Sequence, residues 1–466
     1  MNLAKIKIPN TYVIIFSLLI ITTILTWVIP SGEYQRIVVE GKKEVVNNSF
    51  HYETGNPQGM GDLLMAPIRG FVDASLIIGL VFIVGGAFAV FQKTEAVDSL
   101  ILGIAKLHKD SRVVRLLLIP IFMIIFSLAG AIFGMSEEVI PFILVFVPLA
   151  LTLGYDTITG VAIPFVGAGA GFAGAFLNPF TVGIAQEIAG LPLFSGIVYR
   201  GLCWLITTGA AITFVMLYAK RIKTRPDKSI TFNMDSEKKK KLDHLEIENH
   251  KGISRRHRLV LFTFLAGLAV LIFGVLKYQW FIEELAAVFL ITGIAVGLVG
   301  GLSVNEITES FIKGAKDLVG TALIIGLARG ILILSRDGKI IDSMLFALSS
   351  PISSLHPVIS SQAMFLVQTL INFFVPSGSG QAVLTMPIMA PLSDIVGVSR
   401  QIAVLAFQFG DGFTNMIIPT SAVTMGVLSL AEIPWEKWAR WVLPLEIIFY
   451  IVGMILLIPP FLFGWK

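Results

Sequence analysis

Four short polar stretches interrupt otherwise apolar sequence, and they carry side chains of the kinds that bind small charged molecules. Carboxylates attract cations and protons, whereas serines and glycines let backbone N–H groups approach an anion. The candidate residues are Ser136, Glu137 and Glu138; Asn178, Pro179 and Thr181; Ser377, Gly378, Ser379, Gly380 and Gln381; and Asp411, Thr414, Asn415, Thr420 and Ser421. Together they predict one site for a charged or zwitterionic solute.

The acidic members of this set are Glu137, Glu138 and Asp411. Three carboxylates favour a cationic substrate, a coupling proton or sodium ion, or both. Alternatively, the two glutamates only accept hydrogen bonds from their own loop or lie at its cytoplasmic mouth. Arg329 lies inside an apolar run, where it can receive a substrate carboxylate, pair with an acid, or extend toward water.

Cysteine and histidine do not predict a metal or cofactor site. The one cysteine, Cys203, lies in an apolar run, and the six histidines fall in loops or at the ends of such runs without ligand spacing. We therefore expect no metal and no cofactor. An enzyme would need a nucleophile with its base, but Ser136 beside Glu137 lacks an orienting partner. A membrane-embedded enzyme or a scaffold is the less favoured class.

Composition predicts the elements that position these residues. Of 466 residues, 55% are hydrophobic and 14% charged, and the mean hydropathy is +0.83, which leaves too little polar surface for a water-soluble chain. A membrane-spanning helix needs about 20 apolar residues. Nine candidate runs are 12–30, 72–92, 157–177, 201–218, 259–276, 285–302, 318–334, 402–418 and 441–463. We expect an all-α polytopic membrane protein with about nine transmembrane helices in a lipid bilayer.

Basic residues are concentrated in one linker, residues 219–258, rather than spread over a nucleic-acid-binding face. Because cytoplasmic loops of membrane proteins are rich in Lys and Arg, this linker is expected in the cytoplasm, together with the N-terminus that carries Lys5 and Lys7. The polar stretch 31–61 is then expected outside. A second reading gives Lys238 to Lys241 a role in binding lipid headgroups. No partner nucleic acid is expected.

The two halves of the chain resemble each other in order. Six short matches recur at offsets between 241 and 247 residues, for example 76–80 with 323–327 and 169–172 with 410–413. Such spacing predicts an internal repeat. The first repeat covers 1–218, with a hairpin at 116–154 and a broken helix at 157–186. The second covers 285–466, with a hairpin at 357–397 and a broken helix at 402–421.

The span in residues 259–284 has no counterpart in the first half, so the second repeat is expected to be inverted relative to the first. Two re-entrant hairpins would then enter from opposite sides; the alternative is that their arms are full spans with the tips in loops. Pro179 and Pro419 open the helices that follow, and opened backbone at membrane depth binds ions and substrates in transporters. A single proline kink would serve packing alone. The paired breaks favour alternating access.

At these residues the sequence resembles the YfcC family, within the DcuC-like C4-dicarboxylate carrier group of the ion transporter superfamily. The resemblance covers nearly the whole chain and is carried by 134–138, 154–156, 178–186, 195–200, 376–381 and 415–421. It implies nine spans with two opposed hairpins, an elevator-type movement, a homodimer and a bacterial cytoplasmic membrane location.

The resemblance also bears on the substrate. Members of the YfcC family resemble arginine/ornithine exchangers, whereas the broader group is named for dicarboxylate carriers. A dicarboxylate site should have an excess of cationic or N–H donors, but Glu137, Glu138 and Asp411 are acids. We therefore expect a basic amino acid antiporter or symporter for arginine, ornithine or lysine. The alternative is a carrier of C4-dicarboxylates or other small carboxylates.

Overall fold

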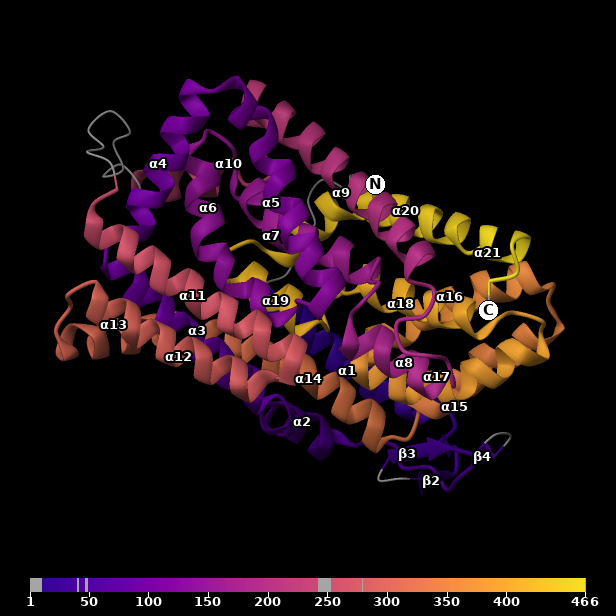
Figure 1. The fold of residues 1–466 in the computed structure, drawn as a ribbon. Coiled ribbons are helices and arrows are strands. Elements are labelled where there is room, and N and C mark those ends of the chain that lie inside the picture. Colours follow the sequence, from indigo (N-terminus) through magenta and orange to yellow (C-terminus); the bar gives the residue numbers. More distant parts are fainter. Residues whose placement is uncertain (1–10, 40–41, 47–48, 242–252, 279, 466) are drawn as a thin grey trace, which may run out of the picture.

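The computed structural model is almost entirely helical, and it describes residues 1–466 except 1–10, 40–41, 47–48, 242–252, 279 and 466 (Figure 1). Within the described residues, eight helices are long and apolar enough to cross a membrane. The expected runs at 12–30 and 157–177 form shorter apolar helices, and all nine runs hold a helix. The prediction of an all-α polytopic membrane protein is confirmed.

One set of helices, here called the scaffold group, packs along the lower left of Figure 1. Its members are α1 (Thr11–Val28), α2 (Met60–Asp73), α3 (Ser75–Lys93), α11 (Arg255–Tyr278), α12 (Ile282–Val299), α13 (Val304–Asp317) and α14 (Val319–Asp337). Helix α3 packs on α12 and α13, and α14 packs on α1 and α2. The run expected to form one helix at 72–92 is divided between two helices, because Ala74 separates the end of α2 from the start of α3.

The remaining large set, here called the hairpin group, holds the predicted hairpins and broken helices. It contains α5 (Arg112–Phe133), η2 (Glu137–Phe142), α6 (Ile143–Thr152), α7 (Thr157–Ala173), η3 (Pro179–Gly183), α8 (Ile184–Ile188), α9 (Ile197–Thr224), α16 (Pro357–Phe374), α17 (Gly378–Ile395), α18 (Arg400–Thr414), α19 (Ala422–Leu430), α20 (Trp435–Leu456) and α21 (Pro459–Leu462). Helix α7 packs on α5, α6, α9 and α18, and α18 packs on α16, α17 and α20. Helix α19 lies at the junction, against α14.

Glycines bring α5 and α7 unusually close. A Cβ atom built on Gly130 would collide with the backbone oxygen of Ala168, and one built on Gly171 would collide with the backbone of Ser127. Only residues without a side chain allow backbones to approach this closely. Helix α5 is therefore held firmly against α7.

Short segments connect these groups. They are α4 (Ala96–Asp110), η4 (Pro226–Lys228), α10 (Phe232–Lys241), α15 (Ile341–Ser349) and η5 (Ser350–Ser354). In the basic linker, the Asp235 carboxylate accepts hydrogen bonds from the Thr157 hydroxyl (2.5 Å) and the Thr231 hydroxyl (2.8 Å). This holds α10 at the first residue of α7. The part of the linker that contains α10 is thus attached to the hairpin group.

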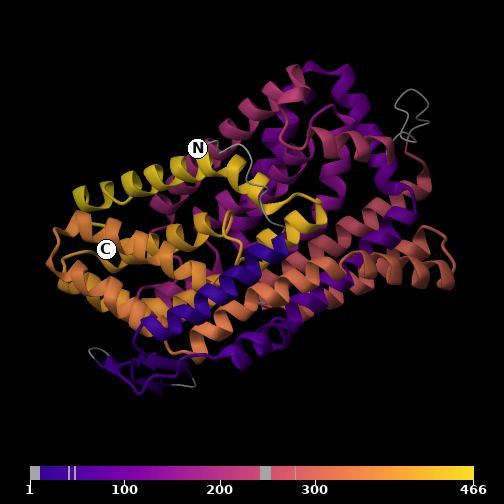
Figure 2. The ribbon, with the colours of Figure 1, turned by 180° about the vertical axis from the view of Figure 1, so that it is seen from behind.

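Four short strands form outside the helical bundle, in the stretch expected outside the cell. Strand β1 (Gly32–Glu33) pairs antiparallel with β4 (His51–Tyr52), placing Gly32 opposite Tyr52, and β2 (Arg36–Val39) pairs antiparallel with β3 (Lys42–Val45). From behind, these strands lie beside the end of α1, as Figure 2 shows. They lie far from α10 in Figure 1, at the other end of the molecule.

Candidate substrate site

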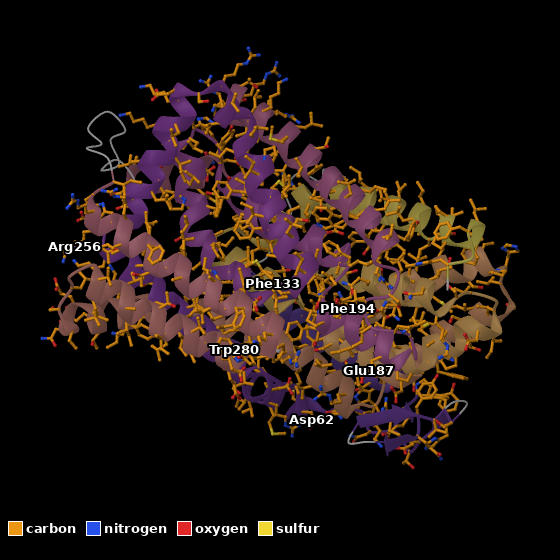
Figure 3. The ribbon with its side chains drawn as sticks, in the orientation of Figure 1. Asp62, Phe133, Glu187, Phe194, Arg256 and Trp280 are labelled. Atoms are coloured by element: carbon orange, nitrogen blue, oxygen red, sulfur yellow. The ribbon has the colours of Figure 1, made fainter. Side chains whose placement is uncertain are left out.

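A cavity of about 300 Å³ lies where the hairpin group meets the scaffold group. The labelled side chains Phe133, at the end of α5, and Trp280 mark this central region in Figure 3. Predicted site residues on its wall are Ser136, Glu137, Glu138, Thr181, Ser377, Gly378, Ser379, Asn415, Thr420 and Ser421. All four polar stretches, which lie up to 285 residues apart in sequence (136 to 421), therefore contribute to one cavity.

The other six candidate residues do not line this cavity. Asn178 and Pro179 form the entry to the π-helical turn η3, where Asn178 Oδ1 accepts a hydrogen bond from Phe180 N at 2.9 Å. Gly380 lines a neighbouring cavity. Gln381 is buried against Gln368 (2.7 Å), and the remaining two, Asp411 and Thr414, are buried behind the wall.

The first tip is shaped by a left-handed glycine. Helix α5 ends at Gly134, whose φ of 71° turns the chain toward Ser136. Glu138 then accepts a hydrogen bond from Ser136 N at 2.9 Å. This is the local contact that the alternative reading of the glutamates expected, yet both Glu137 and Glu138 also line the cavity. Their carboxylates are thus within reach of a solute.

The second tip presents a helix N-terminus to the cavity. Ser377 caps α17, its hydroxyl accepting a hydrogen bond from Gly380 N at 3.3 Å. The first N–H groups of a helix have no partner inside the helix and attract anions. Ser377, Gly378 and Ser379 all line the cavity, so this end is suited to a carboxylate.

Asp411 lies directly behind the second tip. A Cβ atom built on Gly378 would stand 3.0 Å from Asp411 Oδ2, which has no hydrogen-bond partner. The other oxygen, Oδ1, accepts a hydrogen bond from Asn415 Nδ2 at 3.0 Å, and Asn372 Nδ2 donates to the Asp411 backbone oxygen at 3.1 Å. Other oxygens without a partner are Thr181 Oγ1, Asn372 Oδ1, Gln381 Oε1 and Thr420 Oγ1. A cation is the ligand that such oxygens suit.

The scaffold group closes the other side of the cavity with charged and aromatic side chains. Arg329 on α14 forms an ion pair with Asp73 at the end of α2. Of the three roles open to Arg329 from the sequence, the structure shows pairing with an acid. Trp280 and Phe281, at the start of α12, face the same space, and Phe281 packs against Phe180 with ring centroids 5.5 Å apart.

The sequence prediction missed Asp73, Trp280 and Asn372. Two signals were present: Asp73 is an acid next to an apolar run, and Asn372 follows Gln368 by four residues on one face of an apolar helix. Trp280 gave no comparable signal. Among the residues that the structure describes, no group of three His, Cys, Asp or Glu is placed to hold a metal ion.

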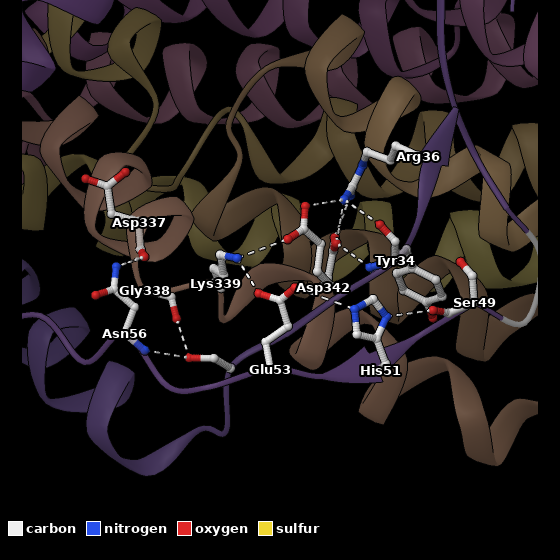
Figure 4. A network of polar contacts seen from close by, with 12 residues as sticks. Tyr34, Arg36, Ser49, His51, Glu53, Asn56, Asp337, Gly338, Lys339 and Asp342 are labelled. Atoms are coloured by element: carbon white, nitrogen blue, oxygen red, sulfur yellow. Dashed lines mark hydrogen bonds and ion pairs between the residues drawn. The ribbon is translucent and has the colours of Figure 1, made fainter. Parts of the chain in front are cut away.

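A second cavity of about 510 Å³ shares Arg329 and Ser377 with the first and extends toward the strands. Its wall carries Arg36, Arg336 and Lys339, together with acids. Figure 4 shows how these charges pair: Arg36 contacts Asp342 at 2.8 Å, and Lys339 contacts both Glu33 (3.2 Å) and Glu53. The hydrogen bond from Lys339 lowers the pKa of Glu53 below its ordinary value.

Comparisons with known proteins identify the family of this chain. The family model for DcuC, the C4-dicarboxylate anaerobic carrier, matches residues 8–461. The chain belongs to the DcuC family. It is therefore a secondary transporter, not an enzyme, and a multi-pass membrane protein that moves a small-molecule substrate.

Two curated relatives of this DcuC-family chain span nearly its whole length. YfcC of Escherichia coli (strain K12), provisionally named a basic amino acid antiporter, is 36% identical over 98% of this chain and 97% of its own. An uncharacterized Haemophilus influenzae protein is 30% identical over 97% of this chain and 96% of its own. The prediction of a YfcC-family member is confirmed.

Two solved structures resemble this chain at lower sequence identity than the curated relatives do. The Alcanivorax borkumensis YdaH transporter matches with a TM-score of 0.46 and 16% identity, covering 98% of this chain and 99% of its own. Neisseria gonorrhoeae MtrF, from a class of antimetabolite efflux pumps, matches with a TM-score of 0.44 and 15% identity. The match covers 97% of this chain and 95% of MtrF.

Proposed function

We propose that this DcuC-family transporter exchanges basic amino acids, namely arginine, ornithine or lysine, across the bacterial cytoplasmic membrane. The observation that carries the proposal is the charge of the cavity wall. The charged side chains that line it in the described structure are Asp73, Glu137, Glu138 and Arg329. Since Asp73 and Arg329 neutralise each other, two glutamates face the solute, and they favour a cation.

The same cavity can bind both ends of an amino acid. The N-terminus of α17 at Ser377–Ser379 meets the α-carboxylate, and Glu137 and Glu138 meet the side-chain cation. Trp280 and Phe281 add aromatic faces on which a guanidinium can stack. The provisional name of YfcC supports this substrate class.

A small carboxylate, such as a C4-dicarboxylate, is the second candidate. The family description names such a substrate, and the N-terminus of α17 is a suitable anion site. Against it, a dicarboxylate would place two negative charges beside Glu137 and Glu138, where like charges repel.

For the transport cycle we propose an elevator movement, in which the hairpin group slides along the scaffold group and carries the cavity with it. The placement of the cavity between the two groups supports this. We further propose the two inverted repeats, a cytoplasmic N-terminus and linker, and a homodimer. A proton or a sodium ion would serve as the coupling ion.

Counterflow in proteoliposomes tests the substrate. Vesicles containing the purified transporter are loaded with unlabelled arginine, ornithine, lysine, succinate or fumarate, and uptake of the corresponding labelled compound is followed. We expect uptake with the three basic amino acids and none with the two dicarboxylates. Counterflow of succinate or fumarate without counterflow of arginine would contradict the proposal.

A further inference from the structure

Another acid is buried in the hairpin group, away from the candidate site. Glu446 lies in the middle of α20 (Trp435–Leu456), and its side chain is only 1% exposed. Neither of its carboxylate oxygens has a hydrogen-bond partner. An acid inside a membrane helix that is buried in protein without a partner has no role in ordinary packing.

The other buried residues of α20 are apolar or aromatic: Trp438, Trp441, Val442, Leu445, Phe449, Gly453 and Leu456. Helix α20 packs on α18 and α9, and its neighbouring residue Phe449 stacks on Phe413 with ring centroids 4.8 Å apart. One turn further along, Gly453 lies against Phe365 and Phe413. An ionised carboxylate in such a place would lose its hydration without any compensating contact, whereas a protonated carboxyl would not carry that penalty.

Several titratable groups on the helices packed against α20 have hydrogen bonds elsewhere, although Nε and Nη1 of the buried Arg200 and Oδ2 of Asp411 have none. On α9, the Tyr199 hydroxyl donates to the Leu456 backbone oxygen (2.5 Å), Arg200 donates to Gln401 (3.2 Å), and the Tyr218 hydroxyl donates to Asp156 (2.6 Å). The other titratable groups on α9, α18 and the start of α20 are Cys203, Lys220, Arg221, Lys223, Arg400, Asp411, Glu436, Lys437 and Arg440. No ion pair joins a described basic side chain to Glu446.

Tyr450 connects the turn of Glu446 to the candidate site. It follows Glu446 by four residues and therefore lies on the same face of α20. Its hydroxyl lies 3.0 Å from Thr414 Oγ1, and the Thr414 hydroxyl donates to the Gly410 backbone oxygen at 2.6 Å. Asp411 is the next residue along the chain, so the hydroxyl contact of Tyr450 ends one residue from the acid behind the second tip.

We propose that Glu446 is a proton-binding residue that carries the coupling proton of the transport cycle. The inference rests on the proposed exchange function and identifies its coupling ion. We take the carboxyl to keep its O–H bond in this conformation, because neither oxygen has a partner that would accept the proton. Release of the proton to water requires the packing of α20 against α18 and α9 to change, and the returning proton restores the neutral carboxyl.

Infrared spectroscopy of the purified transporter tests proton binding without any substrate. We expect a carbonyl stretching band of a protonated carboxylic acid at neutral pH in the wild type. This band should lose intensity in Glu446→Gln and keep it in Glu309→Gln, which changes an exposed glutamate on α13. An identical band in wild type and Glu446→Gln would overturn the proposal.

Proteoliposomes that contain a pH-sensitive dye test coupling. We expect an imposed arginine gradient to drive proton movement in the wild type, and this movement to fall at least tenfold in Glu446→Gln while arginine counterflow continues. Proton movement that is unchanged in this variant, or absent in the wild type despite arginine counterflow, would overturn the proposal.

A second variant keeps the proposal testable if Glu446→Gln fails to fold. Tyr450→Phe keeps the acid and removes only the hydroxyl beside Thr414, so we expect the infrared band to persist and proton movement to slow severalfold; a wild-type rate would count against the connection to the site. Absence of arginine counterflow in the wild type would refute the proposed function instead, and the infrared band alone would then decide whether Glu446 binds a proton.

Discussion

Glu137 and Glu138 are two neighbouring acids that reach the cavity because Gly134 turns the chain at the end of α5. Replacing either by glutamine keeps the shape and removes the charge. Since a hydrogen bond to a charged group contributes about 1.5–3 kcal/mol, we expect each variant to bind arginine roughly tenfold or more weakly. Equilibrium binding of labelled arginine measures this, with Glu309→Gln as the control. Unchanged affinity in both variants would remove the charge argument.

At this scale the structure places the predicted polar tips on the wall of one cavity, whereas their partners were not predicted. Ser136 to Glu138 and Ser377 to Ser379 stand out because polar residues in apolar runs are costly unless they face a cavity. Asp73 and Asn372 were missed, since one lies at a helix end and the other resembles an ordinary buried amide. The local signals for these two residues were too weak to single them out, because their placement depends on how distant helices pack.

Helix α7 shows how a glycine determines the packing of a whole element. Because a Cβ on Gly171 would collide with the backbone of Ser127, Gly171→Ala should force α5 and α7 apart and destabilise the fold by about 1–3 kcal/mol. Thermal unfolding of the detergent-solubilised transporter measures the loss. Gly201→Ala is the matched control, since nothing lies within 4 Å of its added Cβ. Equal melting temperatures for both variants would contradict the close approach.

The stability of the external strands depends on ion pairs whose acidic side chains can be protonated. The folded-state pKa of Glu53 lies below its unfolded value because of Lys339, so the stabilisation is present above about pH 4.3 and is lost as the pH falls through the folded value. Hydrogen exchange at 31–33 and 51–53, corrected for intrinsic rates, should therefore quicken in acid. Glu53→Gln should exchange quickly already at neutral pH. Protection that is independent of pH in the wild type would contradict this.

Helices could be predicted where the length of an apolar run and the position of a helix-breaking residue indicate the same helix end. Pro179 marks the opening of the first broken helix, which continues as the π-helical turn η3, and the polar stretch after Thr414 ends α18. The strands at 32–52 were not predicted, since they pair over only two to four residues and are held by contacts with 337–342. Such contacts join segments that lie about 300 residues apart.

The whole molecule consists of two groups of helices with a cavity between them, and the proposed movement requires their contact to slide. Thr321 on α14 and Ser429 on α19 touch across this boundary, with their hydroxyl oxygens 3.0 Å apart. Replacing both by cysteine, with Cys203→Ser, should allow a disulfide. We expect oxidation to stop arginine counterflow and reduction to restore it. Full transport by the cross-linked protein would contradict sliding at α19.

Hydrophobic runs and charge distribution therefore predicted the class and the general plan of this molecule, and the comparisons place it in the DcuC family. The repeat, the orientation and the dimer stay predictions. In the proposed function the substrate is selected by the charges of one cavity, where the ion pair of Arg329 with Asp73 leaves Glu137 and Glu138 uncompensated.

Competition binding tests the central claim most directly. Labelled arginine is bound to the purified wild-type transporter and displaced with increasing ornithine, lysine, succinate or fumarate, and the experiment is repeated with the Glu137→Gln, Glu138→Gln double variant. We predict displacement by the basic amino acids alone and loss of arginine binding in the double variant. Tight binding of succinate or fumarate in place of arginine, or arginine binding that is unaffected by the double substitution, would contradict the account.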